Sequence, residues 1–224
     1  MTRAITVRDV IKSELRHGII SEGEQLDESV FGTRLHASRT AVREAMSSLV
    51  AEGVLDRRRR EGTTVKRAPL GFDIHAMFPS DNGTHAVASQ LTADRIVPGP
   101  PLIQSLLGLI DEEVLLREYL LTAGETAIGF RISYRERQYS GRGPSDSLNN
   151  LAEWFRQVFQ RELGRVSTCI EYAVSDPRTS TLLGIPEGSP LLVREQIFYD
   201  DSNVAREVAF TQLRADMVAL TDIR

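Results

Sequence analysis

The stretch 38–46 constrains this chain more than any other. Residues 36–46 read His-Ala-Ser-Arg-Thr-Ala-Val-Arg-Glu-Ala-Met, and from Val42 onward the apolar residues recur with the period of a helix that docks on a core. Ser38 stands where an N-cap belongs, because its hydroxyl can accept a hydrogen bond from a free N–H of the first turn. The other side of the first two turns presents groups that reach phosphates and base edges: Arg39, Thr40 and Arg43.

Downstream of this helix the sequence predicts a small basic β-hairpin. A short strand over 54–56 is followed by four consecutive arginines, 57–60, and then by a Gly-containing turn and a second short strand that ends at Val65. A hairpin with arginines beside its turn is typical of the wing of a winged helix-turn-helix. Since alternate residues of a strand point to opposite sides, we expect about two of the four arginines to reach DNA.

Two further helices upstream complete the pattern. Thr6, followed three residues later by Asp9, predicts a helix start, and a second helix should begin at Asp27 or Glu28. His36 then lies in the tight turn before the helix described first. Residues 1–66 therefore read helix, turn, helix, turn, helix, wing, which is the order of a winged helix-turn-helix. The residues that we expect to contact DNA are Arg34, Ser38, Arg39, Thr40, Arg43, Arg58, Arg60, Gly62 and Thr63.

The charge distribution favours two parts with different partners. Residues 1–67 carry 13 basic and 10 acidic side chains, whereas residues 68–224 carry 14 and 21. This asymmetry is typical of a DNA-binding module joined to a body that does not bind DNA. We predict a DNA-binding domain over 1–67, a linker leading into the second domain over 68–85, and an effector-binding and dimerisation domain over 86–224.

The cysteine content and the lengths of the apolar runs disfavour several classes of protein. A lone cysteine, Cys169, allows neither an internal disulfide nor a cysteine-based metal cluster, and its apolar strand predicts a buried, inert thiol. No apolar run is long enough to span a bilayer, and the N-terminus shows no signal peptide. We expect a cytoplasmic protein that has no cofactor, metal or membrane partner.

The second domain is predicted to be α+β. A helix ending at Gly108 and a hairpin over 114–137 are followed, about 76 residues later, by a similar helix ending at Gly184 and a hairpin over 190–213. A strand over 86–97, a polar loop over 140–147, a helix over 148–163 closed by Gly164, and a strand over 166–174 fill the rest. Two such halves favour one mainly antiparallel sheet with helices packed on it.

The motifs resemble those of bacterial GntR-family repressors. The N-terminal likeness covers about residues 5–66 and rests on Leu26-Asp27-Glu28, Phe31, Leu35, residues 38–45, Leu49, Glu52-Gly53 and Gly62-Thr63. The body is similar to the ligand-sensing UTRA domain of the HutC subfamily, through residues 182–188, Leu192-Val193-Arg194 and Asp200-Asp201 leading to Ala205-Arg206-Glu207. This resemblance implies a chorismate-lyase-like fold without that enzyme's activity, a homodimer, and a small effector that alters operator affinity.

Some positions depart from the family pattern. His36 replaces the usual glycine, although histidine tolerates a positive φ better than most side chains. In the body, Phe130 stands where the family often has a glutamate, Glu207 keeps the matching one, and Leu213 replaces a frequent tyrosine. These changes favour an effector that differs from the sugar phosphates of the family or is more apolar. The all-helical FadR-type branch is excluded by the predicted strands and by histidines without metal-ligand spacing: His17, His36, His75 and His85.

We therefore predict a homodimeric regulator, a repressor, that binds double-stranded operator DNA on the bacterial nucleoid and responds to a small molecule. The candidate effector contacts are Arg117, Arg131, Arg194 and Glu207. These side chains could instead pair with one another across strands on an exposed sheet face. Two other functions stay open: a constitutive dimeric DNA-binding protein without effector, and a lyase-like enzyme, which no paired acid and base supports.

Overall fold

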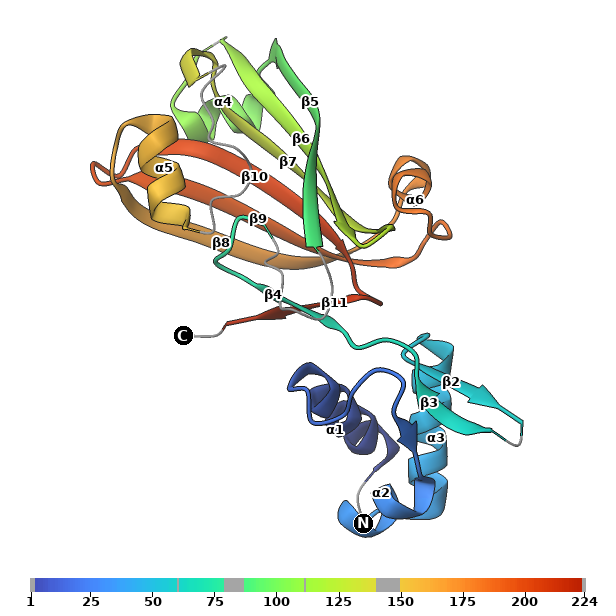
Figure 1. Cartoon of the computed structure of the whole chain (residues 1–224). Helices are drawn as coiled ribbons and strands as arrows, with labels where there is room; N and C mark the ends of the chain where they lie inside the picture. The colour runs from blue at the N-terminus through green and yellow to red at the C-terminus, as the bar shows by residue number, and fades with distance from the viewer. Residues whose placement is uncertain (1–2, 60, 79–86, 111, 140–149, 223–224) are drawn as a thin grey trace. The chain divides into compact units, whose positions relative to one another are not determined.

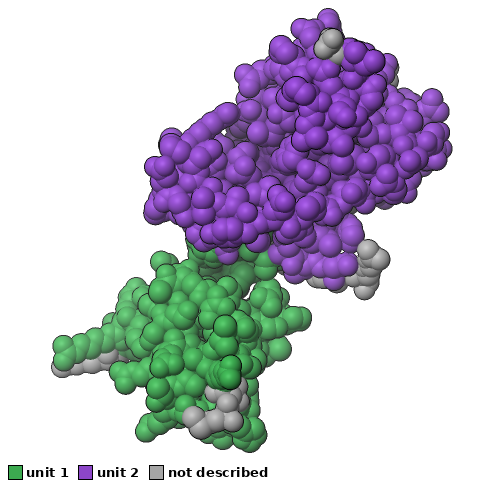
Figure 2. Space-filling view, turned by 180° about the vertical axis from the view of Figure 1, so that it is seen from behind, with its two compact units in different colours: residues 1–71, 216–219 green, residues 72–215, 220–224 purple. Residues whose placement is uncertain are grey.

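The computed structural model describes residues 3–59, 61–78, 87–110, 112–139 and 150–222. The chain forms two compact units. The first comprises Met1–Gly71 with Asp216–Ala219, and the second comprises Phe72–Ala215 with Leu220–Arg224 (Figure 2). Each unit is described by itself below.

The first unit is a three-helix domain with a small antiparallel sheet of order β1-β3-β2 (Figure 1). Its elements are α1 (Ala4–Arg16), β1 (Gln25–Leu26), α2 (Glu28–Arg34), α3 (Arg39–Ala51), β2 (Leu55–Arg58) and β3 (Gly62–Val65). The apolar stripe of α3 is buried, and Val42, Met46 and Leu49 pack with Ile11 of α1 and Phe31 of α2 in one core. The predicted winged helix-turn-helix order is therefore what this unit contains.

Local capping sets the ends of α2 and α3. The Ser38 hydroxyl accepts a hydrogen bond from the Ala41 N–H at 3.2 Å, which confirms the predicted N-cap. Asp27 caps α2 in the same way, and His36 between the two helices adopts a φ of 49°. The expected capping role of Thr6 is wrong: α1 begins two residues earlier and has no side-chain cap.

The second unit is built on a six-stranded antiparallel sheet of order β5-β6-β7-β10-β9-β8 (Figure 1). The strands β4 and β11, whose residues are divided between the two units, pair with each other. The strand β4 lies in the stretch predicted to be linker, where apolar residues do not recur with a regular spacing. The elements are β4 (Leu70–Asp73), β5 (Val87–Pro98), α4 (Pro101–Leu107), β6 (Glu113–Ala123), β7 (Thr126–Glu136), a 3-10 turn (Arg137–Tyr139), α5 (Leu151–Phe159), β8 (Leu163–Val174), α6 (Pro177–Leu183), β9 (Pro190–Asp200), β10 (Ala205–Arg214) and β11 (Val218–Thr221).

The predicted repeat is confirmed. The helix α4 ends at Gly108 with φ 70° and α6 ends at Gly184 with φ 63°, and a hairpin follows each of them. The left-handed φ at both positions is what glycine adopts without a Cβ penalty. Pairing of β7 with β10 joins the two hairpins at the centre of the sheet.

Helices cover both faces of this sheet. Ile197 packs under α4, whereas its neighbour Phe198 packs under α5, so the two helices lie on opposite faces. The predicted helix over 148–163 is shorter: α5 ends at Gln160 with φ 54°, and Gly164 already belongs to β8. The predicted loop over 140–147 falls outside the described residues. The prediction for Cys169 is wrong, because its thiol lies on an exposed edge strand.

Candidate functional site

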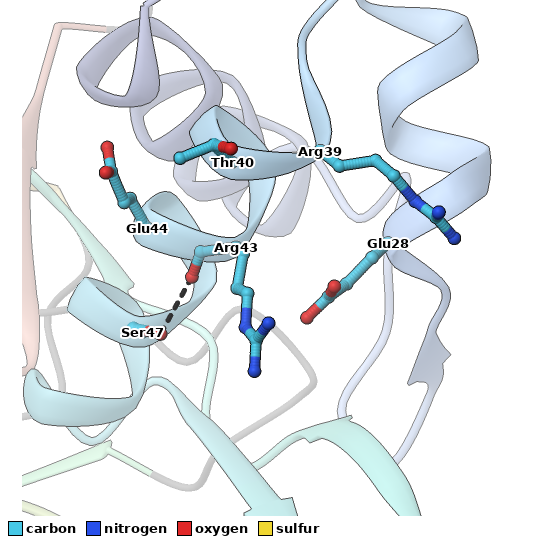
Figure 3. A pocket seen from close by; sticks show the side chains of 6 residues that line it. All are labelled: Glu28, Arg39, Thr40, Arg43, Glu44 and Ser47. Atoms are coloured by element: carbon cyan, nitrogen blue, oxygen red, sulfur yellow. Dashed lines mark hydrogen bonds between the residues drawn. The ribbon is translucent and has the colours of Figure 1, made fainter.

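The exposed side of α3 opens into a hollow of about 720 Å³ in the first unit. Figure 3 shows Arg39 and Arg43 on neighbouring turns of α3, with Glu28 of α2 facing them. The Ser47 hydroxyl donates a hydrogen bond to the Arg43 carbonyl at 2.7 Å, and this local bond occupies it. The lining consists of Glu28, Arg39, Thr40, Arg43, Glu44 and Ser47.

The positive charge of this surface is not neutralised locally. Within the described residues, neither Arg39 nor Arg43 makes a side-chain hydrogen bond or an ion pair, and both are exposed. Glu28, the acid that faces them, is already paired with Arg57 of the wing at 2.8 Å. The start of α3 therefore presents two free guanidinium groups beside the positive end of a helix dipole. Such groups bind phosphates and guanine edges.

A second, larger hollow of about 1030 Å³ runs between α3 and the wing. Arg43 lines both hollows, so the helix surface continues into the wing. Arg58 is exposed and forms ion pairs with Asp56 at 3.0 Å and Glu61 at 3.6 Å, which are weak in water. The lining comprises Gln25, Leu26, Asp27, Glu28, Arg43, Arg57, Arg58, Arg59, Gly62 and Thr63.

The other expected DNA contacts have different surroundings. Arg34 lies over the Phe31 ring and pairs with Glu14 at 2.5 Å. The Ser38 hydroxyl is occupied by its capping bond. Thr63 is only 5% exposed, and its hydroxyl accepts a hydrogen bond from Arg57. Arg60 lies outside the described residues. The structure thus brings Arg39, Thr40, Arg43, Arg58, Gly62 and Thr63 to the hollowed surfaces, whereas the hydroxyls of Ser38 and Thr63 accept hydrogen bonds from within the chain.

In the second unit, the strands bring a cluster of arginines together on one face of the sheet. Arg131 of β7 lies opposite Thr211 of β10, which in turn lies opposite Arg194 of β9. Arg135, four residues after Arg131 on the same face, lies opposite Glu207. These side chains are buried, which excludes the interpretation of an exposed sheet face. We call Arg131, Arg135, Arg194 and Glu207 the buried arginine cluster.

The cluster holds more positive charge than its own residues neutralise. Arg131 donates to Glu207 at 2.7 Å, with 0% and 2% of the two side chains exposed. Asp200, the other acid that is buried in the described part of the chain, is already paired with Arg206. Burial lowers the pKa of Arg131 and of Arg135, and it lowers the pKa of Arg194 to about 9 with the Arg131 charge adding to the effect. Three buried guanidinium groups thus accompany one buried carboxylate, while the charges of Asp94 and Asp73 act on Arg135 and Arg194 from outside the cluster.

Several donors of the cluster also find no hydrogen-bond partner in the described structure. They are Nε and Nη1 of Arg131, Nε and Nη1 of Arg135, and Nε of Arg194. Burying a charged donor without a partner costs several kcal/mol, so such groups in folded proteins are normally satisfied by water, an ion or a ligand. An anion placed here would satisfy both the charge and the donors.

Arg194 also binds a segment of main chain. Its guanidinium stacks on the Phe72 ring at 4.6 Å and donates to four main-chain carbonyls, those of Asp73, Ile74, Ala76 and Met77, at 2.8 to 3.3 Å. It therefore fixes the segment 73–77 against the sheet. The next residue, Phe78, lies near the guanidinium of Arg131 at 5.8 Å.

Sequence reasoning found three members of the cluster and missed Arg135. The signal was present, because Arg131 and Arg135 differ by an even number of residues along one strand and so share a face. Arg117, the fourth predicted effector contact, lies on the same face but is paired with Asp94 at 2.8 Å. Phe130 points to the opposite face, where it lines a hollow of about 630 Å³ beside α6, and Leu213 is fully buried.

The described residues contain neither a candidate metal site nor a membrane-spanning helix. No group of three or more His, Cys, Asp or Glu side chains there is placed to hold a metal ion. No helix in that part of the chain is long and apolar enough to cross a membrane.

A basic winged helix-turn-helix unit and a separate antiparallel-sheet unit with a buried charged cluster define a two-part DNA-binding regulator. Comparison with known families makes this specific. Residues 4–65 match the bacterial regulatory proteins of the gntR family, and residues 82–219 match the UTRA domain. The chain therefore belongs to the GntR-family transcriptional regulators that carry a UTRA domain, and it is not an enzyme.

Individual relatives agree with this assignment. The chain is 26% identical over 201 residues to the HTH-type transcriptional repressor PhnF of Mycolicibacterium smegmatis, covering 85% of this chain and 80% of that protein. The crystal structure of PhnF from Mycobacterium smegmatis matches with a TM-score of 0.64 and 21% identity over 97% and 98% of the two chains. YydK of Bacillus subtilis, a possible transcriptional regulator, matches over 100% of both chains with a TM-score of 0.56 and 13% identity. At these identities the structural matches show the fold.

Proposed function

We propose that this chain is a homodimeric, effector-responsive repressor of the HutC subfamily that acts on operator DNA in the bacterial cytoplasm. The observation that carries the DNA-binding part is the pair of unneutralised arginines, Arg39 and Arg43, on the exposed side of α3. Two such helices, one from each copy, would enter successive major grooves of a pseudo-palindromic site about one helical turn apart. The relative named as a repressor supports the direction of regulation.

In this proposal the predicted DNA contacts act in two ways. Arg39 and Arg43 reach base edges, while Thr40, Arg34 and the backbone around Ser38 contact phosphates and fix the register. Arg58, Arg60, Gly62 and Thr63 belong to the wing and bring it against the flanking backbone. Phosphate contacts make the affinity fall as salt rises, whereas base contacts determine the sequence.

The test of the DNA-binding part is a gel-shift titration at fixed salt, with DNA that flanks the protein's own gene. Arg43→Ala should weaken binding by about 1–3 kcal/mol, which is roughly 10- to 100-fold in Kd. Arg16→Ala is the matched control, because Arg16 is an exposed arginine of α1 outside both hollows. Undiminished binding by Arg43→Ala, or an equal loss in the control, would contradict the proposed role of α3.

The effector part is supported by the charge of the buried arginine cluster. Three buried guanidinium groups in a cluster with one buried carboxylate, and five donors lacking partners in the described structure, favour a small anion as the effector. Such an anion would lie near Phe78 and Arg194, and thus beside the segment 73–77 that Arg194 fixes. Binding would favour one arrangement of that segment and so bias a two-state equilibrium of DNA affinity.

Arg135 provides a sharp test of this part. It makes no hydrogen bond with any described residue, so Arg135→Met removes a buried charge and leaves no acceptor unsatisfied. We expect this variant to be more stable than the wild type in the absence of anions. A panel of carboxylate and phosphate metabolites should contain one that raises the Tm of the wild type but not of the variant. If no anion stabilises the wild type, a constitutive dimeric DNA-binding protein is the better description.

A further inference from the structure

The two edges of the six-stranded sheet differ in how they are protected. The edge strand β5 is interrupted by a register shift between Leu91 and Ala93, and it ends at a proline. Its charged residues are used within the chain, since Asp94 pairs with Arg117 and Arg95 with Glu118. Bulges, prolines and paired charges keep an edge from joining another sheet.

The opposite edge, β8, has few of these protections. It runs for 12 residues and pairs with β9 in unbroken register from Arg165 to Val174. Three large apolar side chains on one of its faces are exposed: Ile170 by 45%, Tyr172 by 70% and Val174 by 54%. A long, regular edge with exposed apolar residues is a template for adding another strand.

The sequence of β8 is complementary to itself. When β8 is laid antiparallel to a second copy so that Thr168 faces Thr168, Arg165 lies opposite Glu171 and Val166 lies opposite Ile170. Gly164 then lies opposite Tyr172, and Ser167 opposite Cys169. Because of the two-fold symmetry, each unlike pair occurs twice. One alignment therefore provides two ion pairs, two apolar pairs and two aromatic side chains over glycines.

The contacts that Arg165 and Glu171 make within one chain do not prevent them from pairing between two copies. Glu171 is exposed and makes no ion pair within the described residues. Arg165 is held beside the edge, where it stacks on Tyr199 at 3.6 Å and donates to Asn203 at 2.8 Å. The acid is free, and the base is positioned on the same face of the strand.

We propose that β8 is the docking surface for a second copy of this chain, and that two β8 strands pair antiparallel with Thr168 on the two-fold axis. The inference rests on the proposed homodimer and specifies the surface by which it forms. It joins two six-stranded sheets into one, so that the exposed apolar face of each β8 lies beside α5 of the other copy, which packs over Val166.

A disulfide experiment on the full chain tests the alignment. Ser167→Cys places a new thiol opposite Cys169 of the second copy, with Cβ atoms about 5 Å apart. Mild oxidation should then give a covalent dimer in high yield on a non-reducing gel. The matched control is Cys169→Ser with Glu171→Cys, an equally exposed position on the same face. Its two thiols would be about 20 Å apart and should stay uncrosslinked.

Charge reversal tests the energetics by analytical ultracentrifugation. Arg165→Glu or Glu171→Arg alone should raise the dimer Kd about tenfold, and the double variant should restore it. The restoration separates pairing from folding, because the double variant does not recover the contacts of Arg165 with Tyr199 and Asn203.

The outcomes also separate this inference from the proposed function. A dimer that binds the gel-shift DNA, but gives no Ser167→Cys crosslink and no charge effect, overturns the β8 interface and leaves the regulator intact. A chain that is monomeric at all concentrations overturns the interface and the homodimer together. Crosslinking of both the test and the control variants would show non-specific collision and likewise overturn the alignment.

Discussion

Removing the carboxylate of Glu207 should destabilise the second unit by several kcal/mol. Glu207 and Arg131 are 2% and 0% exposed and lie 2.7 Å apart, and the charge of Glu207 also acts on the guanidinium group of Arg135. In Glu207→Gln, Arg131 would remain buried without its ion-pair partner, and Arg135 would lose the attraction of the Glu207 charge. Breaking a buried pair from one side costs about 3–5 kcal/mol, which is a large share of the stability of a domain.

Unfolding of the second unit can be measured by the fluorescence of the chain's single tryptophan. Trp154 lies in α5 and packs against Phe198, so its fluorescence reports the unfolding of the second unit. With a urea dependence of about 2 kcal/mol per molar, the loss corresponds to a midpoint about 2 M lower. Glu113→Gln is the control, because Glu113 pairs with Arg137 on the surface, and there a loss below about 1 kcal/mol is expected.

A double variant completes the test. Arg131→Met with Glu207→Leu replaces the pair by apolar side chains of similar size, and it should recover the part of the stability lost in Glu207→Gln that comes from the unpaired Arg131. The reasoning would be refuted if Glu207→Gln lost less than about 1 kcal/mol, or if the double variant were no more stable than the single one.

Three further predictions concern local structure. Gly129→Ala should cost about 2–3 kcal/mol in the Trp154 assay, because its Cβ would lie 2.4 Å from the Gln212 carbonyl oxygen of β10, and near-wild-type stability would contradict that close contact. His36→Gly should stabilise the first unit by about 0.5–1 kcal/mol, since φ is 49° there, and a calorimetric transition that does not rise would argue against strain at this turn. Burial raises the pKa of Asp200, but hydrogen bonds from a backbone N–H and from Arg206 lower it overall. Its stabilisation should therefore be complete above the usual aspartate pKa of about 4 and lost as the pH falls further, so the urea midpoint should drop less between pH 5 and pH 3 in Asp200→Asn than in the wild type.

The parts of the fold that depend on near neighbours in sequence could be predicted. The Ser38 cap, the left-handed turn at His36 and the glycines that end α4 and α6 involve residues within about four positions of one another. Their chemistry is therefore visible in the sequence itself. The same holds for the repeated helix and hairpin, from which one antiparallel sheet was expected.

The parts of the fold that depend on strand order could not be predicted from the sequence. Cys169 is exposed because β8 is an edge of the sheet, and no local pattern says which strand lies at an edge. The pairing of Arg131 with Glu207 joins residues 76 positions apart, so their burial became visible only in the fold. Arg135 is different: strand alternation alone would have placed it beside Arg131.

The bonds from Arg194 to the carbonyls of residues 73–77 have a consequence for synthesis on the ribosome. The donor lies 117 to 121 positions after its acceptors. At about 5–20 residues per second, roughly 6 to 24 seconds pass between the two leaving the ribosome. The first unit's three helices and wing are complete by Val65 and can fold in that interval. The nascent chain therefore carries a folded DNA-binding domain before Arg194 is available to bind the carbonyls of residues 73–77.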